Sequence, residues 1–236
     1  GADPKESDRA EGGRGVSWPA TDEDGFGPED VVRLTGVSRE TFGRVSGYLE
    51  LLDQWRERIN LIGPGEGRHL WRRHVLDSAQ LLKEISSEDK SVADLGSGAG
   101  FPGLILGCAL AEREGASVTL VEKSPRKSEF LEAASRELKL PVKVVNLRIE
   151  DGAPEGGRPR YDVVTARALA PLPKLLGFAA SWLKPSGKAL LMKGRDTAAE
   201  LAEAREAWTF DLSTLDSLSS PEGRVLKVSS LRSRRV

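Results

Sequence analysis

The stretch VADLGSGAGFPG, residues 92–103, combines an acidic residue with closely spaced glycines. Asp94 lies at the end of a short apolar run, and Gly96, Gly98 and Gly100 follow it. Glycine lets a backbone turn tightly and come close to a ligand. In the fingerprint of dinucleotide-binding proteins two residues separate the second and third glycines, whereas here only one does. The pattern therefore predicts a ligand-binding turn and disfavours a dinucleotide-dependent oxidoreductase.

The acidic residues around this turn indicate the kind of ligand. A carboxylate just before the glycines suits a cationic or neutral ligand better than a pyrophosphate, and the order acid, G-x-G-x-G resembles that of S-adenosylmethionine-dependent methyltransferases. Glu122 ends the next apolar run, where open α/β sheets place an acid that accepts hydrogen bonds from ribose hydroxyls. The alternative is a surface acid that pairs with Lys123 or Lys127.

A third group of candidates follows the next apolar run. Ile149 offers an apolar contact for an adenine, and Glu150 lies beside it, although Asp151 can serve instead of Glu150. We therefore expect S-adenosylmethionine as the cofactor. These patterns predict the following cofactor-binding residues: Asp94, Gly96, Gly98, Gly100, Glu122, Ile149 and Glu150.

Several kinds of methyl transfer lack their usual residues. Methylation of cytosine C5 needs a thiolate, but Cys108 lies in the apolar run LILGCAL and is expected in the core. Methylation of exocyclic amines usually goes with an [N/D]-P-P-[Y/F/W] motif, whereas TARALAPL here offers Arg167. With only His69 and His74, no metal site is expected.

Four stretches of the chain resemble the GidB (RsmG) family of bacterial methyltransferases. They are NLIGPGEGRHLWRRHVLDS, VADLGSGAGFPG, TARALAPL and LLMKG, and the similarity covers roughly residues 38–230. The resemblance implies methylation of the N7 atom of a guanine in 16S ribosomal RNA of the small subunit. It places cofactor contacts at Gly96, Phe101, Ile149, Glu150 and Arg167. Other hallmark positions of the family fall on Asn60, Arg73, His74, Asp77 and Lys193.

Guanine N7 carries an in-plane lone pair and no hydrogen. Attack on the sulfonium methyl group therefore needs no general base, and we expect no catalytic residue in that sense. The rate enhancement then comes mainly from holding nitrogen, methyl carbon and sulfur in line. Fixed dipoles aimed at the changing charges can add to it.

Arginines gather around the loop that begins at Asn60. Five of them lie between Gln54 and His74, where they can contact phosphates and make the affinity for RNA depend on salt. Trp71 is a candidate for stacking on a base, whereas Trp55 fits an apolar helix face. We expect RNA to meet Asn60, Arg72, Arg73, His74, Arg167 and Lys193.

These residues need a scaffold, and the apolar pattern predicts one. Helical spacing covers residues 38–59, with Ser38 as the N-cap, and a second helix is expected over 69–85. Strands are expected at 92–95, 118–122, 142–146, 161–166, 188–193 and 225–229, with helices beginning near Pro102, Ser124, Pro171 and Asp196. Such alternation indicates parallel βαβ units. The fold class is thus α/β; the resemblance makes it a Rossmann-like methyltransferase fold with a mostly parallel seven-stranded sheet and an N-terminal helical extension.

The charge distribution divides the chain further. Residues 1–30 carry nine acidic and three basic residues, whereas the rest carries 32 basic and 27 acidic residues. We expect a disordered acidic leader at 1–28, a helical region at 29–88 and the methyltransferase core at 89–236. No apolar run reaches the ~20 residues of a membrane span, and the single cysteine suits a reducing cytoplasm. A monomer is expected because no heptad pattern appears.

Two other functions are compatible with the same motifs. A small-molecule methyltransferase would have a closed apolar pocket and no salt-dependent RNA binding. An RNA-binding assembly factor could keep the fold without turnover. The residues leave open whether free RNA or an assembled particle is the substrate.

Overall fold

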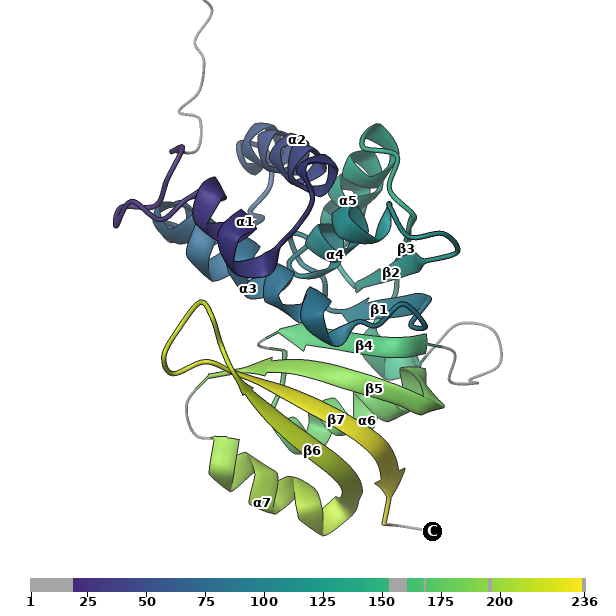
Figure 1. The fold of residues 1–236 in the computed structure, drawn as a ribbon. Coiled ribbons are helices and arrows are strands. Elements are labelled where there is room, and N and C mark those ends of the chain that lie inside the picture. The colour runs from purple at the N-terminus through teal and green to yellow at the C-terminus, as the bar shows by residue number, and fades with distance from the viewer. Residues whose placement is uncertain (1–18, 153–160, 168, 195–196, 235–236) are drawn as a thin grey trace, which may run out of the picture.

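The computed structural model describes residues 19–152, 161–167, 169–194 and 197–234 (Figure 1). Its centre is a seven-stranded sheet in the order β3-β2-β1-β4-β5-β7-β6. The pairs among the first five strands are parallel, and β7 pairs antiparallel with both β5 and β6. The strands are β1 (Ser91–Leu95), β2 (Ser117–Glu122), β3 (Val142–Asn146), β4 (Tyr161–Arg167), β5 (Leu183–Lys193), β6 (Trp208–Asp216) and β7 (Arg224–Ser233).

Helices cover both faces of the sheet. Alternate strand residues point to opposite faces, so Val92 joins one apolar core and Ala93 the other. The first core contains side chains of α2 (Arg39–Arg56), α4 (Gly103–Leu110) and α5 (Pro125–Glu137), and the second those of α6 (Leu172–Trp182) and α7 (Thr197–Ala207). These layers confirm the expected Rossmann-like α/β fold with N-terminal helices.

The N-terminal helical part differs from the prediction in its second half. α1 (Pro28–Thr35) precedes α2, and the Ser38 hydroxyl caps α2 by accepting from the Thr41 amide at 2.9 Å. One α-helix was expected over residues 69–85. This part of the chain instead consists of short helical segments that differ in pitch, namely η1 (Glu66–His69), the π-helical η2 (Trp71–Leu76), α3 (Asp77–Ala79) and η3 (Gln80–Glu84). π-helical turns inside helices are often found at functional sites.

The beginning of the chain also departs from expectation. Residues 1–18 of the expected leader lie outside the described residues, but residues 19–27 pack on the helices. The buried carboxylate of Asp22 accepts hydrogen bonds from the backbone amides of Trp71 and Arg72, at 3.0 and 2.9 Å. Phe26 is buried nearby. The expectation of disorder up to residue 28 was therefore wrong. The acidic composition gave no sign that one of these carboxylates, that of Asp22, caps a helix.

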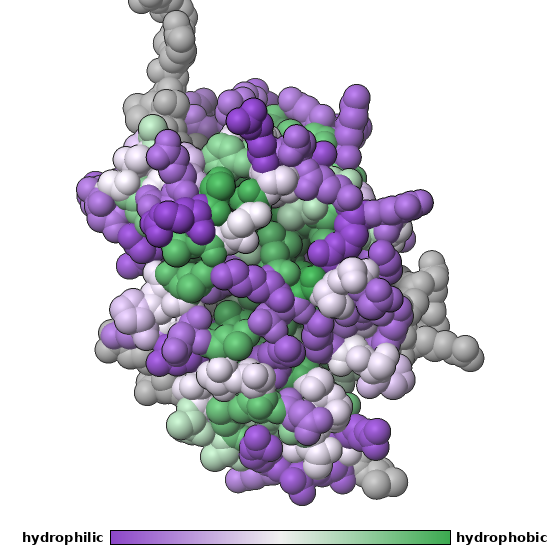
Figure 2. All heavy atoms as spheres, in the orientation of Figure 1, coloured by the Kyte–Doolittle hydropathy of each residue, from purple (hydrophilic) through white to green (hydrophobic). Residues whose placement is uncertain are grey.

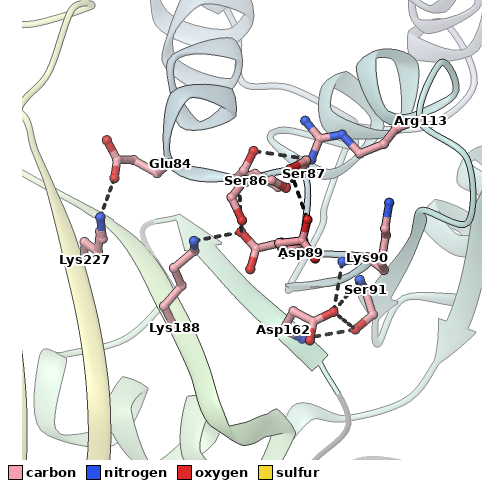
Figure 3. Close-up of polar contacts among 12 residues, drawn as sticks. Glu84, Ser86, Ser87, Asp89, Lys90, Ser91, Arg113, Asp162, Lys188 and Lys227 are labelled. Atoms are coloured by element: carbon pink, nitrogen blue, oxygen red, sulfur yellow. Dashed lines mark hydrogen bonds and ion pairs between the residues drawn. The ribbon is translucent and has the colours of Figure 1, made fainter.

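Polar residues fasten the helical part to the sheet at the amino ends of the strands (Figure 3). Oδ2 of Asp89 accepts from the Ser86 amide and from Nζ of Lys188, both at 2.7 Å. Asp162 at the start of β4 accepts from the backbone amide of Lys90 at 3.0 Å. This edge is occupied by structural contacts, so the opposite edge, where the parallel strands end, is the place for a ligand.

Two single residues behave as expected. Cys108 is fully buried, and this burial raises the pKa of its thiol to about 12, which confirms a core role. Trp55 packs on Phe130 with ring centroids 5.6 Å apart.

Hydrophilic side chains cover most of the face in Figure 2, with hydrophobic ones showing between them. In the described part of the chain, no helix is long and apolar enough to cross a membrane.

Candidate cofactor and substrate site

The glycines after β1 form a turn that other residues would not fit. Gly96, Gly98 and Gly100 have φ angles of 73°, 57° and 106°, in the left-handed region that favours glycine. A Cβ on Gly96 would lie 2.8 Å from Cδ1 of Leu169. This cradle brings the backbone against the wall of a cavity, as a tightly held ligand requires.

Asp94 holds this turn from below. Its Oδ1 accepts from the Thr165 hydroxyl at 2.8 Å, and its Oδ2 accepts from the Gly103 amide at 3.1 Å. The side chain is 1% exposed, and burial raises its pKa to about 6. Asp94 therefore joins β1, β4 and the start of α4, and it does not line the three cavities described below.

The carboxylate of Glu122, at the end of β2, stabilises the glycine turn through hydrogen bonds. Its Oε2 accepts from the Gly98 amide at 2.9 Å, and its Oε1 accepts from the Ser124 amide at 2.8 Å. The carboxylate is buried and pairs with neither Lys123 nor Lys127 among the described contacts, which removes the surface-acid alternative. A carboxylate has about four lone-pair sites, so two remain for hydroxyl donors.

Three neighbouring cavities follow the carboxyl ends of the strands. The strand-end cavity, of about 330 Å³, is lined by Gly96, Gly98, Glu122, Ile149, Glu150 and Phe178 among others. The central cavity, of about 210 Å³, shares Gly96 and Gly98 with it and adds Glu66, Phe101 and Arg167. The hairpin cavity, of about 590 Å³, shares Glu66 and Arg167 with the central one and reaches the loop between β6 and β7. They adjoin one another through these shared residues, and the three together are called the crevice below.

Apolar, acidic and basic side chains line the strand-end cavity. Leu147, Ile149, Leu169 and Phe178 supply apolar walls and Glu122 supplies acceptors, and four basic residues also line it: Lys123, Lys127, Arg148 and Lys174. The apolar walls suit a flat aromatic base, and the acceptors suit a hydroxylated sugar. The chemistry of the lining therefore fits the adenosine part of S-adenosylmethionine.

Phe101 forms the floor of the central cavity. Its ring lies 5.3 Å from that of Tyr48 and 4.9 Å from that of His74, and the guanidinium of Arg167 lies 5.8 Å away. The Tyr48 hydroxyl donates to the carbonyl of Ala99 at 2.7 Å. Sequence reasoning missed Tyr48, whose only signal was a hydroxyl on an apolar helix face.

Arg167 at the end of β4 holds the π-helical segment in place. Its Nη1 donates to the carbonyl of Arg73 at 3.0 Å, and Nη2 donates to Nδ1 of His74 at 3.1 Å. Because a guanidinium has no acceptor, the proton of a neutral His74 must be on Nε2. Burial first and then the charge of Arg167 lower the pKa of His74 to about 4. Asp77 lies 3.8 Å from Arg167, so His74 and Asp77 meet through this arginine.

Asp77 also anchors the loop between β6 and β7. Its Oδ1 accepts from the Ser219 hydroxyl at 2.6 Å, and the Gln80 side chain accepts from the Leu218 amide at 2.8 Å. This loop forms one wall of the hairpin cavity, and nothing in the local sequence indicated it. Lys193 lines the same cavity while pairing with Glu200 at 2.8 Å.

Three residues expected near the RNA lie outside the hairpin cavity. Asn60 is exposed and lines a further cavity of about 670 Å³, which shares Leu61, Ile62 and Gly63 with the central cavity. Arg72 pairs with Asp24 at 3.0 Å. Trp71 is buried against Phe42, so it is not available for stacking on a base.

Comparison with known proteins decides the family. The family model GidB, described as rRNA small subunit methyltransferase G, matches residues 43–225. The chain belongs to this family. It is 46% identical to ribosomal RNA small subunit methyltransferase G of Paramagnetospirillum magneticum over 85% of this chain and 94% of that one. It is 42% identical to that of Caulobacter vibrioides over 84% and 89%.

Solved structures agree with the GidB assignment at the level of fold. A S-adenosylmethionine-dependent methyltransferase from Aquifex aeolicus superimposes with a TM-score of 0.53 at 16% identity, covering 78% of this chain and 96% of that one. The chain is thus a methyltransferase of the GidB family, as the resemblance in its motifs implied, and it has the fold of S-adenosylmethionine-dependent methyltransferases.

Proposed function

We propose that the protein transfers the methyl group of S-adenosylmethionine to N7 of one guanine in 16S ribosomal RNA of the small subunit. The observation that carries the proposal is this crevice. Gly96 and Gly98 line both the nucleoside-sized strand-end cavity and the central one, and Arg167 lines both the central cavity and the larger hairpin cavity. The hairpin cavity is lined by basic and acidic residues: Arg73, Lys193, Arg224, Glu66, Asp77 and Glu222. One end suits the cofactor, and the other suits a nucleotide of the substrate.

The cofactor end has a role for most of the expected residues. Ile149 offers its side chain to the adenine, Glu122 accepts from the ribose hydroxyls, and Glu150 lies at the rim. Gly96 and Phe101 bound the part of the crevice that suits the methionine portion, and Arg167 attracts its carboxylate. Asp94 keeps the turn in shape without contact to the ligand.

S-adenosylmethionine supplies an electrophilic methyl group on a sulfonium when it is bound. Because guanine N7 carries a lone pair and no hydrogen, a methyl group accepted there would require no proton to leave. The reaction needs no base, and His74 is consistent with this because its Nδ1 already accepts a hydrogen bond from Arg167. The low pKa of the imidazole keeps it neutral. The residues act by alignment and by excluding water.

The RNA end combines near and distant contacts. Arg73 is exposed at the hairpin cavity, and Lys193 and Arg167 line it, so they meet the target nucleotide and its phosphates. Asn60 and Arg72 lie outside this cavity and serve neighbouring parts of the RNA. We further propose that the enzyme acts as a monomer in the cytoplasm, where ribosomes are assembled.

Product analysis tests the function. Small subunits from a strain that lacks this modification are incubated with the protein and methyl-labelled S-adenosylmethionine, and the RNA is digested to nucleosides. We expect the label in 7-methylguanosine at a single position. Label on another atom, or transfer to small molecules alone, would overturn the proposal.

A further inference from the structure

A carboxylate stands at the junction between the central and hairpin cavities. Glu66 lines both, and its side chain is 47% exposed. Oε2 accepts a hydrogen bond from the Gly63 amide at 3.3 Å. Of the described residues, none donates a hydrogen bond to Oε1, which leaves acceptor sites of this carboxylate for a ligand. The cofactor roles proposed above do not use this group.

A buried donor lies next to Glu66. His74 is 4% exposed, and its Nε2 makes no hydrogen bond to any described residue, although Oε2 of Glu66 is only 3.3 Å away. The bond from Arg167 to Nδ1 keeps the proton on Nε2. A small rotation of the carboxylate would satisfy this donor, so His74 is placed to orient Glu66. Arg73 and Arg167 are the other charged groups around the imidazole, and Asp77 lies 3.8 Å from Arg167.

The hydrogen-bonding groups of the bases indicate which base a carboxylate at this place would bind. Guanine presents two adjacent donors, N1–H and the N2 amino group, which a carboxylate accepts together. Adenine presents a lone pair at N1, which a carboxylate repels. The N7 atom belongs to a different edge of the purine, so a base held by N1 and N2 keeps N7 open to the methyl donor.

We propose that Glu66 selects guanine by accepting hydrogen bonds from N1–H and the N2 amino group, and that His74 is the positioning residue for Glu66. The inference rests on the proposed function, since it assumes that the hairpin cavity receives the target nucleotide. Glu66 and His74 then provide base identity, and Arg73 and Lys193 provide phosphate attraction.

Methyl transfer to unmodified small subunits tests the role of Glu66. In Glu66→Gln one oxygen becomes an amide nitrogen that faces the guanine donors, so kcat/KM falls about tenfold to hundredfold, as for loss of a hydrogen bond to a charged group. The affinity for S-adenosylhomocysteine, measured by calorimetry, stays within about twofold and shows that the variant is folded. Glu57→Gln, an exposed carboxylate at the end of α2, is the matched control and keeps full activity.

Base selectivity separates this inference from the proposed function. With S-adenosylhomocysteine present, competition binding compares guanosine, inosine and adenosine 5′-monophosphates as probes. Wild type prefers guanosine over inosine and inosine over adenosine, and Glu66→Gln loses this order. If wild type labels no RNA, the proposed function fails; if wild type labels RNA and Glu66→Gln equals it in turnover and selectivity, only the present inference fails.

A double variant tests whether His74 acts through Glu66. If it does, adding His74→Gln to Glu66→Gln causes little further loss of kcat/KM at saturating cofactor, because the interaction is already gone. Multiplied losses would show that His74 supports the fold independently and would overturn its assignment as the positioning residue.

Discussion

The hydroxyl of Tyr48 donates a 2.7 Å hydrogen bond to the carbonyl of Ala99, which joins α2 to the middle of the glycine turn. The two residues are 51 positions apart, and Tyr48 is fully buried. The N-terminal helical part is thereby fixed to the segment that bounds the cofactor crevice. Its packing therefore bears on cofactor binding as well as on contact with RNA.

Tyr48→Phe should weaken cofactor binding. The variant leaves the buried carbonyl of Ala99 without a donor, so we expect a loss of about 1–2 kcal/mol in unfolding free energy and a several-fold higher Kd for S-adenosylhomocysteine. Tyr161→Phe is the matched control, since its hydroxyl bonds to Thr119 away from the crevice. Equal cofactor affinities in both variants would contradict the assigned link.

Gly96→Ala should abolish tight cofactor binding. The new Cβ meets Leu169 at 2.8 Å and sits on a backbone with φ of 73°. Gly115→Ala isolates the backbone effect, because Gly115 has the same φ with nothing within 4 Å. We expect both to lose about 1 kcal/mol of stability and only Gly96→Ala to lose binding. Calorimetry distinguishes them, and intact binding by Gly96→Ala would refute a cradle at this turn.

Glu122→Gln should lower the cofactor affinity at least tenfold. The amide nitrogen of glutamine would face one of the two backbone donors, Gly98 or Ser124, and disturb the turn. Glu129→Gln, an exposed residue on α5, serves as the control. An affinity for S-adenosylhomocysteine equal to that of the control would show that Glu122 is dispensable.

The pH dependence of stability should report the burial of His74. Its pKa in the folded protein is about 4, below the ordinary value of 6.5. Between these values the unfolded chain binds a proton at this side chain and the folded protein does not, so stability falls as the pH drops from about 6.5 to 4. Relative to His74→Gln, wild type should lose on the order of 2 kcal/mol in urea unfolding over this window. A constant difference would contradict a buried neutral imidazole.

Much of the site was predictable because it lies in short stretches at strand ends. The glycine turn, Glu122 and Ile149 each follow a run whose apolar pattern predicts a strand. β6 was missed, although Trp208, Phe210 and Leu212 alternate with polar residues along it and only Phe210 is fully buried. Gln80 and Leu218 are bonded across 138 positions, and no local signal reports such a contact.

Adjacent residues also make different contacts that the sequence did not distinguish. Arg72 and Arg73 are adjacent, but successive residues on a helix point in different directions. Arg72 reaches Asp24, whereas Arg73 lines the hairpin cavity. Which arginine faces the cavity depended on the pitch of η2 (Trp71–Leu76), and its π-helical turns change the rotation per residue.

A crystal structure with S-adenosylhomocysteine tests the central claim most directly. We predict the adenine against Ile149, the ribose hydroxyls on Glu122 and the amino-acid portion in the central cavity near Arg167. Density for the ligand in another cavity, such as the one beside Asn60, or a protein that binds no S-adenosylhomocysteine at all, would contradict it.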